Sequence, residues 1–175
     1  MSSEPKPEPA RPPRIAVRVA VDVRDWVHQH MTPGGLFTSE GHAIEVATLR
    51  AHWERKYLRQ ECRRLGVPYR DAAYWAMMAE LIRESQPLHP GRSGPNQVFV
   101  EREQIRGFVD ESIRQLLEGD CRPAGPFESA SHAVETYLRH LRKQDTGQNA
   151  APAAEIPFDA KAVWRAYQLV LQAAK

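Results

Sequence analysis

The chain has little of what several large classes of protein need. It contains only two cysteines, Cys62 and Cys121, with no Cys-x-x-Cys pair and no Cys/His spacing typical of zinc ligands. No apolar run approaches the roughly 20 residues of a membrane-spanning helix, and the N-terminus lacks the apolar core of a signal peptide. We therefore expect a cytoplasmic protein without a membrane span or a disulfide framework, whose cysteines are ordinary core or helix-face residues.

Signatures of catalysis and of cofactor binding are also missing. The chain has no glycine-rich phosphate loop of the P-loop or dinucleotide-binding type. His28 and His30 are two residues apart, which places them on opposite sides of a helix and disfavours a metal site. The sequence therefore predicts a protein that is not an enzyme, with no catalytic residues, no cofactor and no bound metal.

Net charge is close to balance, at +2, and so does not by itself favour or exclude a nucleic-acid partner. The distribution is more informative. Between Arg50 and Arg64 the sequence holds basic residues at 50, 55, 56, 59, 63 and 64 and acidic residues only at 54 and 61. Such an excess fits either a solvated helix face or a contact with nucleic acid.

One stretch of the chain occurs twice. Residues 33–45 (PGGLFTSEGHAIE) align without a gap with residues 123–135 (PAGPFESASHAVE), ninety positions later, and the Pro, Gly, Phe, Ser, His, Ala and Glu positions are identical. An internal repeat indicates a fold built from two copies of one unit.

The first half reads as strand, short helix, turn and long helix. Residues 14–23 alternate, with Ile15, Val17, Val19 and Val21 on one face, which predicts a half-buried strand. Asp22 is expected to cap a short helix that ends at the Pro/Gly turn. Ser39 is expected to cap a long helix that stops at Gly66.

The second half repeats this order less clearly. The pattern predicts a strand over 97–101, a helix over 103–118, a helix capped by Ser129 to about residue 143 and a last helix capped by Asp159. We predict six segments: a disordered Pro-rich arm (1–13), a first unit (14–66), a connecting helix and loop (67–96), a second unit (97–144), a linker (145–157) and a C-terminal helix (158–175).

Strand, helix, Gly/Pro turn and Ser-capped helix is an order that resembles the ribbon-helix-helix superfamily of MetJ, Arc, CopG and the ParD antitoxins. In the first half Val23 follows Val19 by four residues, and Trp26 and Val27 then precede the turn and Ser39. The resemblance implies a mostly α fold in which two strands pair as a short antiparallel ribbon that enters the major groove of DNA. Two units in one chain imply a tandem pseudo-dimer, either monomeric or forming a homodimer.

The resemblance also implies which residues meet DNA. Outward side chains of the ribbon contact bases, and these are Arg14, Ala16, Arg18 and Ala20, together with Gln97, Phe99 and Glu101 on the second strand. Val98 and Val100 are the alternative outward set there, because a one-residue slip exchanges the two faces of a strand. Helix N-termini bind phosphate, which implicates Ser39, His42, Ser129, Ser131 and His132.

Three functions remain open. The tandem layout is similar to single-chain members that serve as accessory proteins of plasmid or conjugative DNA transfer and bind the transfer-enhancer ("overdrive") sequence beside a T-DNA border. The second is an antitoxin-type repressor, whose C-terminal helix binds a toxin and is disordered until it does. In the first of these functions the protein also recruits the transfer machinery as a partner. The third function is a helical scaffold that binds protein partners and no DNA.

Overall fold

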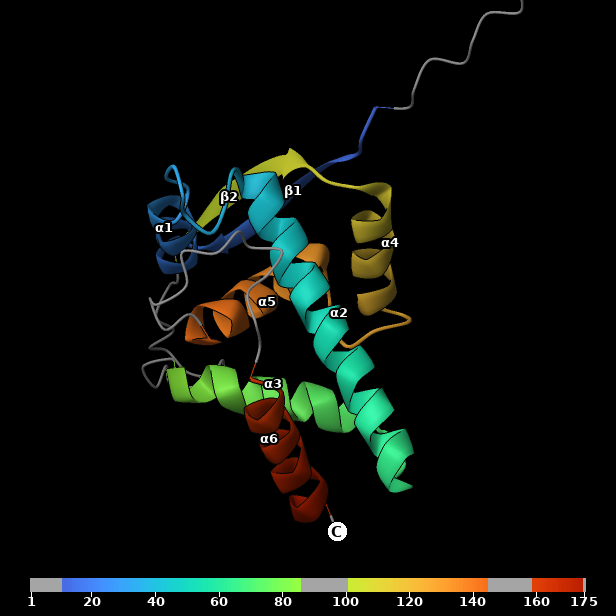
Figure 1. Cartoon of the computed structure of the whole chain (residues 1–175). Helices are drawn as coiled ribbons and strands as arrows, with labels where there is room; N and C mark the ends of the chain where they lie inside the picture. Colours follow the sequence, from blue (N-terminus) through green and yellow to red (C-terminus); the bar gives the residue numbers. More distant parts are fainter. Residues whose placement is uncertain (1–10, 86–100, 145–158, 175) are drawn as a thin grey trace, which may run out of the picture.

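A computed structural model describes residues 11–85, 101–144 and 159–174 (Figure 1). Within these ranges the chain is mostly helical with one two-stranded antiparallel sheet, as expected from the sequence. The elements follow in the order β1 (Arg14–Ala20), α1 (Val21–Gln29), α2 (Glu40–Leu65), α3 (Asp71–Ser85), β2 (Arg102–Phe108), α4 (Glu111–Asp120), α5 (Ala130–Gln144) and α6 (Ala160–Ala173). The predicted arm and linker fall almost entirely outside the described residues.

The two strands come from opposite halves of the sequence and form a ribbon. Arg14 lies opposite Phe108, and the pairing runs antiparallel to the other end of both strands. A side chain from a flanking helix bonds each open edge: Ser131 Oγ accepts from the Arg18 N–H at 3.0 Å, and the Glu40 carboxylate accepts from the Arg106 N–H at 2.7 Å. These two bonds attach α5 and α2 to the ribbon.

The second strand lies later in the sequence than predicted. Residues 97–100 lie outside the described residues, and Glu101 precedes the strand. The helix predicted over 103–118 is wrong for its first six residues, which are extended, and is confirmed from Glu111 onward, where α4 begins. Gly107 explains why the strand was not predicted. It occupies an inward position of β2, where a strand with alternating apolar and polar residues would have an apolar side chain. A Cβ there would lie 2.5 Å from Gly41 Cα, so the close contact of α2 with β2 requires glycine.

The repeated segment folds back onto the preceding helix in both halves, although the two turns differ in detail. The Arg122–Pro123 peptide bond is cis, and Gly35 N–H donates to the carbonyl of Thr32, whereas Gly125 N–H donates to the carbonyl of Cys121. Phe37 N–H donates to the carbonyl of His30 at 3.1 Å, and Phe127 N–H donates to the carbonyl of Asp120 at 3.2 Å. The shared glycine is needed because a Cβ at Gly35 would lie 2.3 Å from the same carbonyl oxygen, with the same clash at Gly125. The repeat therefore preserves a backbone that folds back onto the end of the preceding helix.

Helix boundaries follow the predicted caps with one exception. Ser39 and Asp159 accept from backbone N–H groups three residues on, at 3.1 Å and 3.0 Å, and Gly66 ends α2 with φ of 68°. Asp22 is not the cap of α1, because the helix begins one residue earlier and Ala20 occupies the N-cap position. Asp22 instead pairs with two arginines of α5.

One hydrophobic core serves both halves. α5 packs on β1 and α2 packs on β2, so the second helix of each half lies against the strand of the other. α3 and α6 close the end of the molecule away from the ribbon (Figure 1). Both cysteine thiols are free, and Cys62 is buried on α2 as predicted. Among the described residues no helix has the length and apolar character needed to cross a membrane.

Candidate nucleic-acid interface

The outer face of the ribbon is an exposed surface of six side chains. Because Val17, Val19, Ile105 and Val109 are buried beneath the ribbon, the residues between them face outward. Directly opposite residues share a face, so the outward side chains form three rows. The rows are Arg14 with Phe108, Ala16 with Arg106, and Arg18 with Gln104. We call these six residues the ribbon face; three of them are arginines and none is acidic.

Three of the residues predicted to contact bases have exposed side chains, which the prediction requires. Arg14, Ala16 and Arg18 are exposed on the ribbon face. Ala20 is a wrong prediction, because it is 0% exposed where the strand passes directly into α1. Glu101 lies before β2 rather than in it. Gln97, Val98, Phe99 and Val100 lie outside the described residues.

Three residues of the ribbon face were missed by the sequence prediction. These are Gln104, Arg106 and Phe108. The repeat could have predicted them, because its offset of ninety residues aligns Arg14, Ala16 and Arg18 with these three positions. The helical spacing of Ile105, Phe108 and Val109 favoured a helix over that correspondence.

The acidic side chains beside the ribbon are paired with arginines and do not lie on the ribbon face. Glu103 lies on the inner side of β2 and forms an ion pair with Arg24 of α1. Arg102, at the end of β2, donates to Glu135 of α5 at 2.5 Å and is thereby held away from the ribbon face. The ribbon face consequently keeps its positive character.

The predicted phosphate contacts sit at the N-termini of α2 and α5. Ser39 and Ser129 accept from the backbone N–H groups of His42 and His132, at 3.1 Å and 3.3 Å. The His42 ring turns back to accept from the Thr38 N–H at 3.0 Å, so it completes the cap. The other two predicted residues have different surroundings. Ser131 Oγ accepts from the Arg18 N–H at the ribbon edge, and His132 is exposed, with its ring 5.2 Å from the ring of Phe127.

The two helix N-termini differ in the position of their acidic residues. The first turn of α2 contains Glu40, whose carboxylate also contacts His28 Nε2 at 2.7 Å. The first turn of α5 contains no acidic residue. Glu128, however, is exposed one residue before the Ser129 cap of α5, where α2 has the uncharged Thr38. Each helix start therefore has one carboxylate beside its exposed amides, at a different position.

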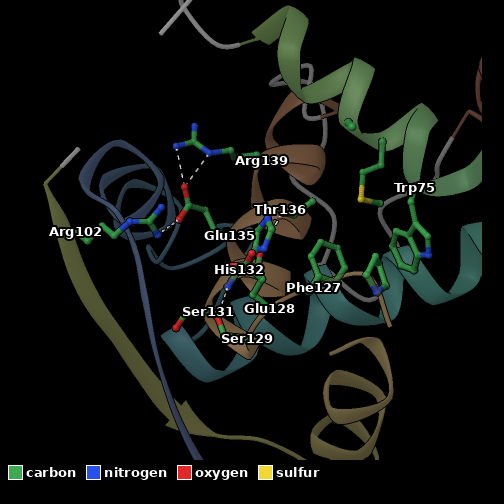
Figure 2. Close-up of a pocket in the computed structure, with 13 residues that line it drawn as sticks. Trp75, Arg102, Phe127, Glu128, Ser129, Ser131, His132, Glu135, Thr136 and Arg139 are labelled. Atoms are coloured by element: carbon green, nitrogen blue, oxygen red, sulfur yellow. Dashed lines mark hydrogen bonds and ion pairs between the residues drawn. The ribbon is translucent and has the colours of Figure 1, made fainter. Parts of the chain in front are cut away.

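A pocket of about 680 Å³ opens beside the N-terminus of α5 (Figure 2). Trp75 of α3 and Phe127 line it, with Ser129 and His132 at the helix start. On its wall Glu135 lies between two arginines and accepts from both, at 2.5 Å from Arg102 and 3.1 Å from Arg139 (Figure 2). Both guanidinium groups are therefore already paired with a carboxylate.

Part of the basic run on α2 is buried instead of facing solvent. Arg50 and Arg55 are 3% and 6% exposed. Arg50 lies beside Glu54, a fully buried carboxylate that also accepts from Gln144 at 2.8 Å and lies 2.7 Å from His140 Nε2. Burial acts to raise the pKa of Glu54, but the charge and hydrogen bonds of these neighbours outweigh burial and lower it.

Arg55 belongs to a second buried cluster, around Asp120. The Asp120 carboxylate accepts from Arg55 at 3.1 Å and from the Tyr137 hydroxyl at 2.5 Å, and lies 3.0 Å from His52 Nε2. Burial opposes ionisation of Asp120, yet its hydrogen bonds and the nearby positive charge lower its pKa overall. Both clusters are saturated with donors inside the protein, so they join α2 to α4 and α5 rather than form an open site.

Within the described ranges no group of three or more His, Cys, Asp or Glu side chains is arranged to hold a metal ion. Comparison of the chain with protein-family models, curated proteins and solved structures returns no match. The functional assignment therefore rests on this protein's own surface: a ribbon face with three arginines, flanked by two serine-capped helix N-termini.

Proposed function

We propose that the chain binds double-stranded DNA sequence-specifically, with the ribbon face in the major groove. The observation that carries the proposal is the ribbon face itself: arginines, a glutamine and an aromatic side chain are exposed in adjacent rows without an acidic residue. Guanidinium groups suit guanine O6 and N7, glutamine suits adenine, and the small side chain of Ala16 permits close approach. Six such side chains on a narrow ribbon match the space the groove offers.

A tandem ribbon-helix-helix pseudo-dimer is the architecture we propose for this binding. Ala16 and Arg106 pair in the ribbon and are also ninety residues apart, so the repeat and the strand register share one approximate two-fold axis. Glu54 and Gln144 are likewise ninety residues apart, and they share a hydrogen bond of 2.8 Å. Two equivalent residues in direct contact lie on the axis that relates them. Both contacts between equivalent residues support a two-fold relation between the halves of the chain, like the relation between the two subunits of a dimer.

The helix N-termini flanking the ribbon serve, in this proposal, as phosphate contacts that set its register on the duplex. Ser39 and His42 act on one side, and Ser129, Ser131 and His132 on the other. Since both serines cap the helices that flank the ribbon, Ser39→Ala and Ser129→Ala are each expected to weaken binding to all duplexes alike. Unchanged binding of both variants would count against this arrangement.

Of the biological roles, an accessory factor of plasmid or conjugative DNA transfer fits best. A repressor of antitoxin type would have its last helix disordered until a toxin binds. Here α6 is packed in the free chain, with Tyr167 fully buried and its hydroxyl accepting from the Arg70 N–H at 2.9 Å. Leu169, 61% exposed on the same helix, still offers a contact point for a protein partner, so the repressor is kept as the second candidate.

Gel-shift titrations of the full chain against random duplex DNA at several salt concentrations test the proposal. DNA binding predicts a steep fall of affinity with salt, because phosphate contacts release counterions, whereas a scaffold predicts no binding. Arg18→Ala and Arg106→Ala should relax sequence preference. Arg63→Ala, an exposed arginine in the last turn of α2, is the matched control and should leave binding unchanged. Equal behaviour of all three variants would exclude the ribbon face.

A further inference from the structure

We infer that the DNA site read by this chain is not self-complementary and is bound in a single orientation. The inference rests on the DNA-binding function proposed above and deepens it. Its basis is the ribbon face, where every pair of residues related by the ninety-residue repeat differs: Arg14 with Gln104, Ala16 with Arg106, and Arg18 with Phe108. Two identical subunits would present identical side chains and so read a palindrome.

One end of the ribbon face combines an arginine with an aromatic ring. Arg14 lies directly opposite Phe108, whose side chain is 62% exposed. An exposed phenylalanine contributes nothing to the core, but in the major groove it matches the C5-methyl group of thymine. With the Arg14 guanidinium beside it, this end is suited to a guanine next to a thymine.

The other end has different chemistry. Arg18 lies opposite Gln104, so a guanidinium and a carboxamide share this row. A carboxamide forms two hydrogen bonds with adenine N6 and N7, which an aromatic ring cannot do. This end is suited to guanine and adenine, and turning the protein around on its site would place each set of groups on the wrong bases.

The flanking helices differ in the same sense. Glu40 stands in the first turn of α2 and bonds the ribbon edge at Arg106, while its counterpart ninety residues on is the uncharged Ala130 of α5. Conversely, Glu128 stands just before the α5 cap, where α2 has the uncharged Thr38, so the two flanks of the ribbon carry their acidic residue at different places. This difference between the two helix N-termini is independent of the ribbon-face residues, and it too favours a single orientation on DNA.

Selection of bound duplexes from a pool with a randomised centre tests the inference on the full chain. The wild type should enrich one motif that differs from its own reverse complement. A variant that copies the β1 set onto β2, Gln104→Arg with Arg106→Ala and Phe108→Arg, changes only exposed side chains and should enrich a self-complementary motif. Circular dichroism confirms that the variant is folded.

Phe108 permits a finer measurement on the enriched duplex. Replacing the thymine at the Phe108 end by uracil removes only the methyl group and should lower wild-type affinity by roughly fivefold. The Phe108→Ala variant should bind both duplexes equally, and base changes at the Gln104 end should affect it as they affect the wild type.

The outcomes separate the two proposals. A self-complementary motif for the wild type would overturn the single orientation and leave DNA binding standing. Failure of the wild type to enrich any duplex would overturn DNA binding itself, and the present inference with it. Equal affinity of the wild type for thymine and uracil duplexes would remove the assigned role of Phe108.

Discussion

Glu54 and Asp120 are buried carboxylates that stay ionised because donors surround them. Glu54 is in contact with His140, Gln144 and Arg50, and Asp120 with Arg55 and the Tyr137 hydroxyl. These contacts lower both pKa values below the ordinary 4.5 and 3.8, even though burial alone would raise them. Each carboxylate therefore stabilises the fold only while it is ionised.

Acid is expected to destabilise the protein through these two groups. A folded-state pKa below the unfolded one means that the unfolded chain binds protons first, so the stabilisation is complete above the ordinary pKa and is lost as the pH falls. The urea midpoint should be steady from pH 7 to about 5 and then fall. Glu54→Gln should cost about 3 kcal/mol at pH 7 and flatten this acid dependence.

Glu118→Gln is the matched control, since Glu118 is exposed on α4 and its loss should barely change the profile. A Glu54→Gln variant as acid-sensitive as the wild type would contradict the assignment.

These buried clusters show a limit of prediction from single residues. Arg50, Glu54 and Arg55 occur at helical spacing among other charged residues, a pattern typical of a solvated face. Only tertiary packing reveals that Asp120, His140 and Gln144, which are distant in the sequence, supply their partners. Ser39 and Ser129 were predictable because a cap depends on neighbours three residues away.

At the scale of elements, the contact of α2 with β2 depends on two glycines. A Cβ at Gly107 would lie 2.5 Å from both the Cα and the N of Gly41, and backbone at that distance must shift. Gly107→Ala should therefore lower the unfolding free energy by about 2 kcal/mol, measured by urea denaturation.

Gly119 offers a control of opposite sign. It lies inside α4, where an added Cβ meets nothing within 4 Å. Gly119→Ala should stabilise the protein by about 0.5 to 1 kcal/mol, because alanine favours the helix. Similar effects of the two substitutions would show that the close approach of α2 to β2 is not what requires glycine.

The elements differed in how well their sequences predicted them. α2 was predictable from its cap, its length and Gly66, which are all local signals. β2 was not, because Gly107 removes one inward side chain and charged residues fill the outward positions, so little period-two signal remains. The missing side chain is explained by Gly41 of α2, which lies 66 residues before Gly107 in the sequence (107 − 41).

For the whole molecule, a single chain permits contacts that a dimer of identical subunits cannot make. Glu54 and Gln144 occupy equivalent places in the two halves and bond to each other. In a symmetric dimer this contact would join two identical side chains, and two carboxylates would repel. In this chain the contact joins a carboxylate and a carboxamide, which are complementary.

Gln144→Glu places two carboxylates in this contact and so tests whether the complementarity of Glu54 and Gln144 matters. Two adjacent carboxylates raise the pKa of the pair, and a raised folded-state pKa means that stability is lost as the pH rises. The variant should be less stable than the wild type by about 2 kcal/mol at pH 7, with the deficit shrinking toward pH 4. Gln168→Glu, at an exposed position of α6, should show no such deficit; a pH-independent deficit at 144 would mean that packing, not charge, is responsible.

The central claim is that the ribbon face occupies the major groove, and methylation protection of a selected duplex tests it most directly. Dimethyl sulfate modifies guanine N7 in the major groove and adenine N3 in the minor groove. The wild type should protect guanine N7 at both ends of its site, and Arg18→Ala should lose protection at the Gln104 end alone. Protection confined to adenine N3, or guanine protection that survives replacement of all three ribbon-face arginines, would contradict the account.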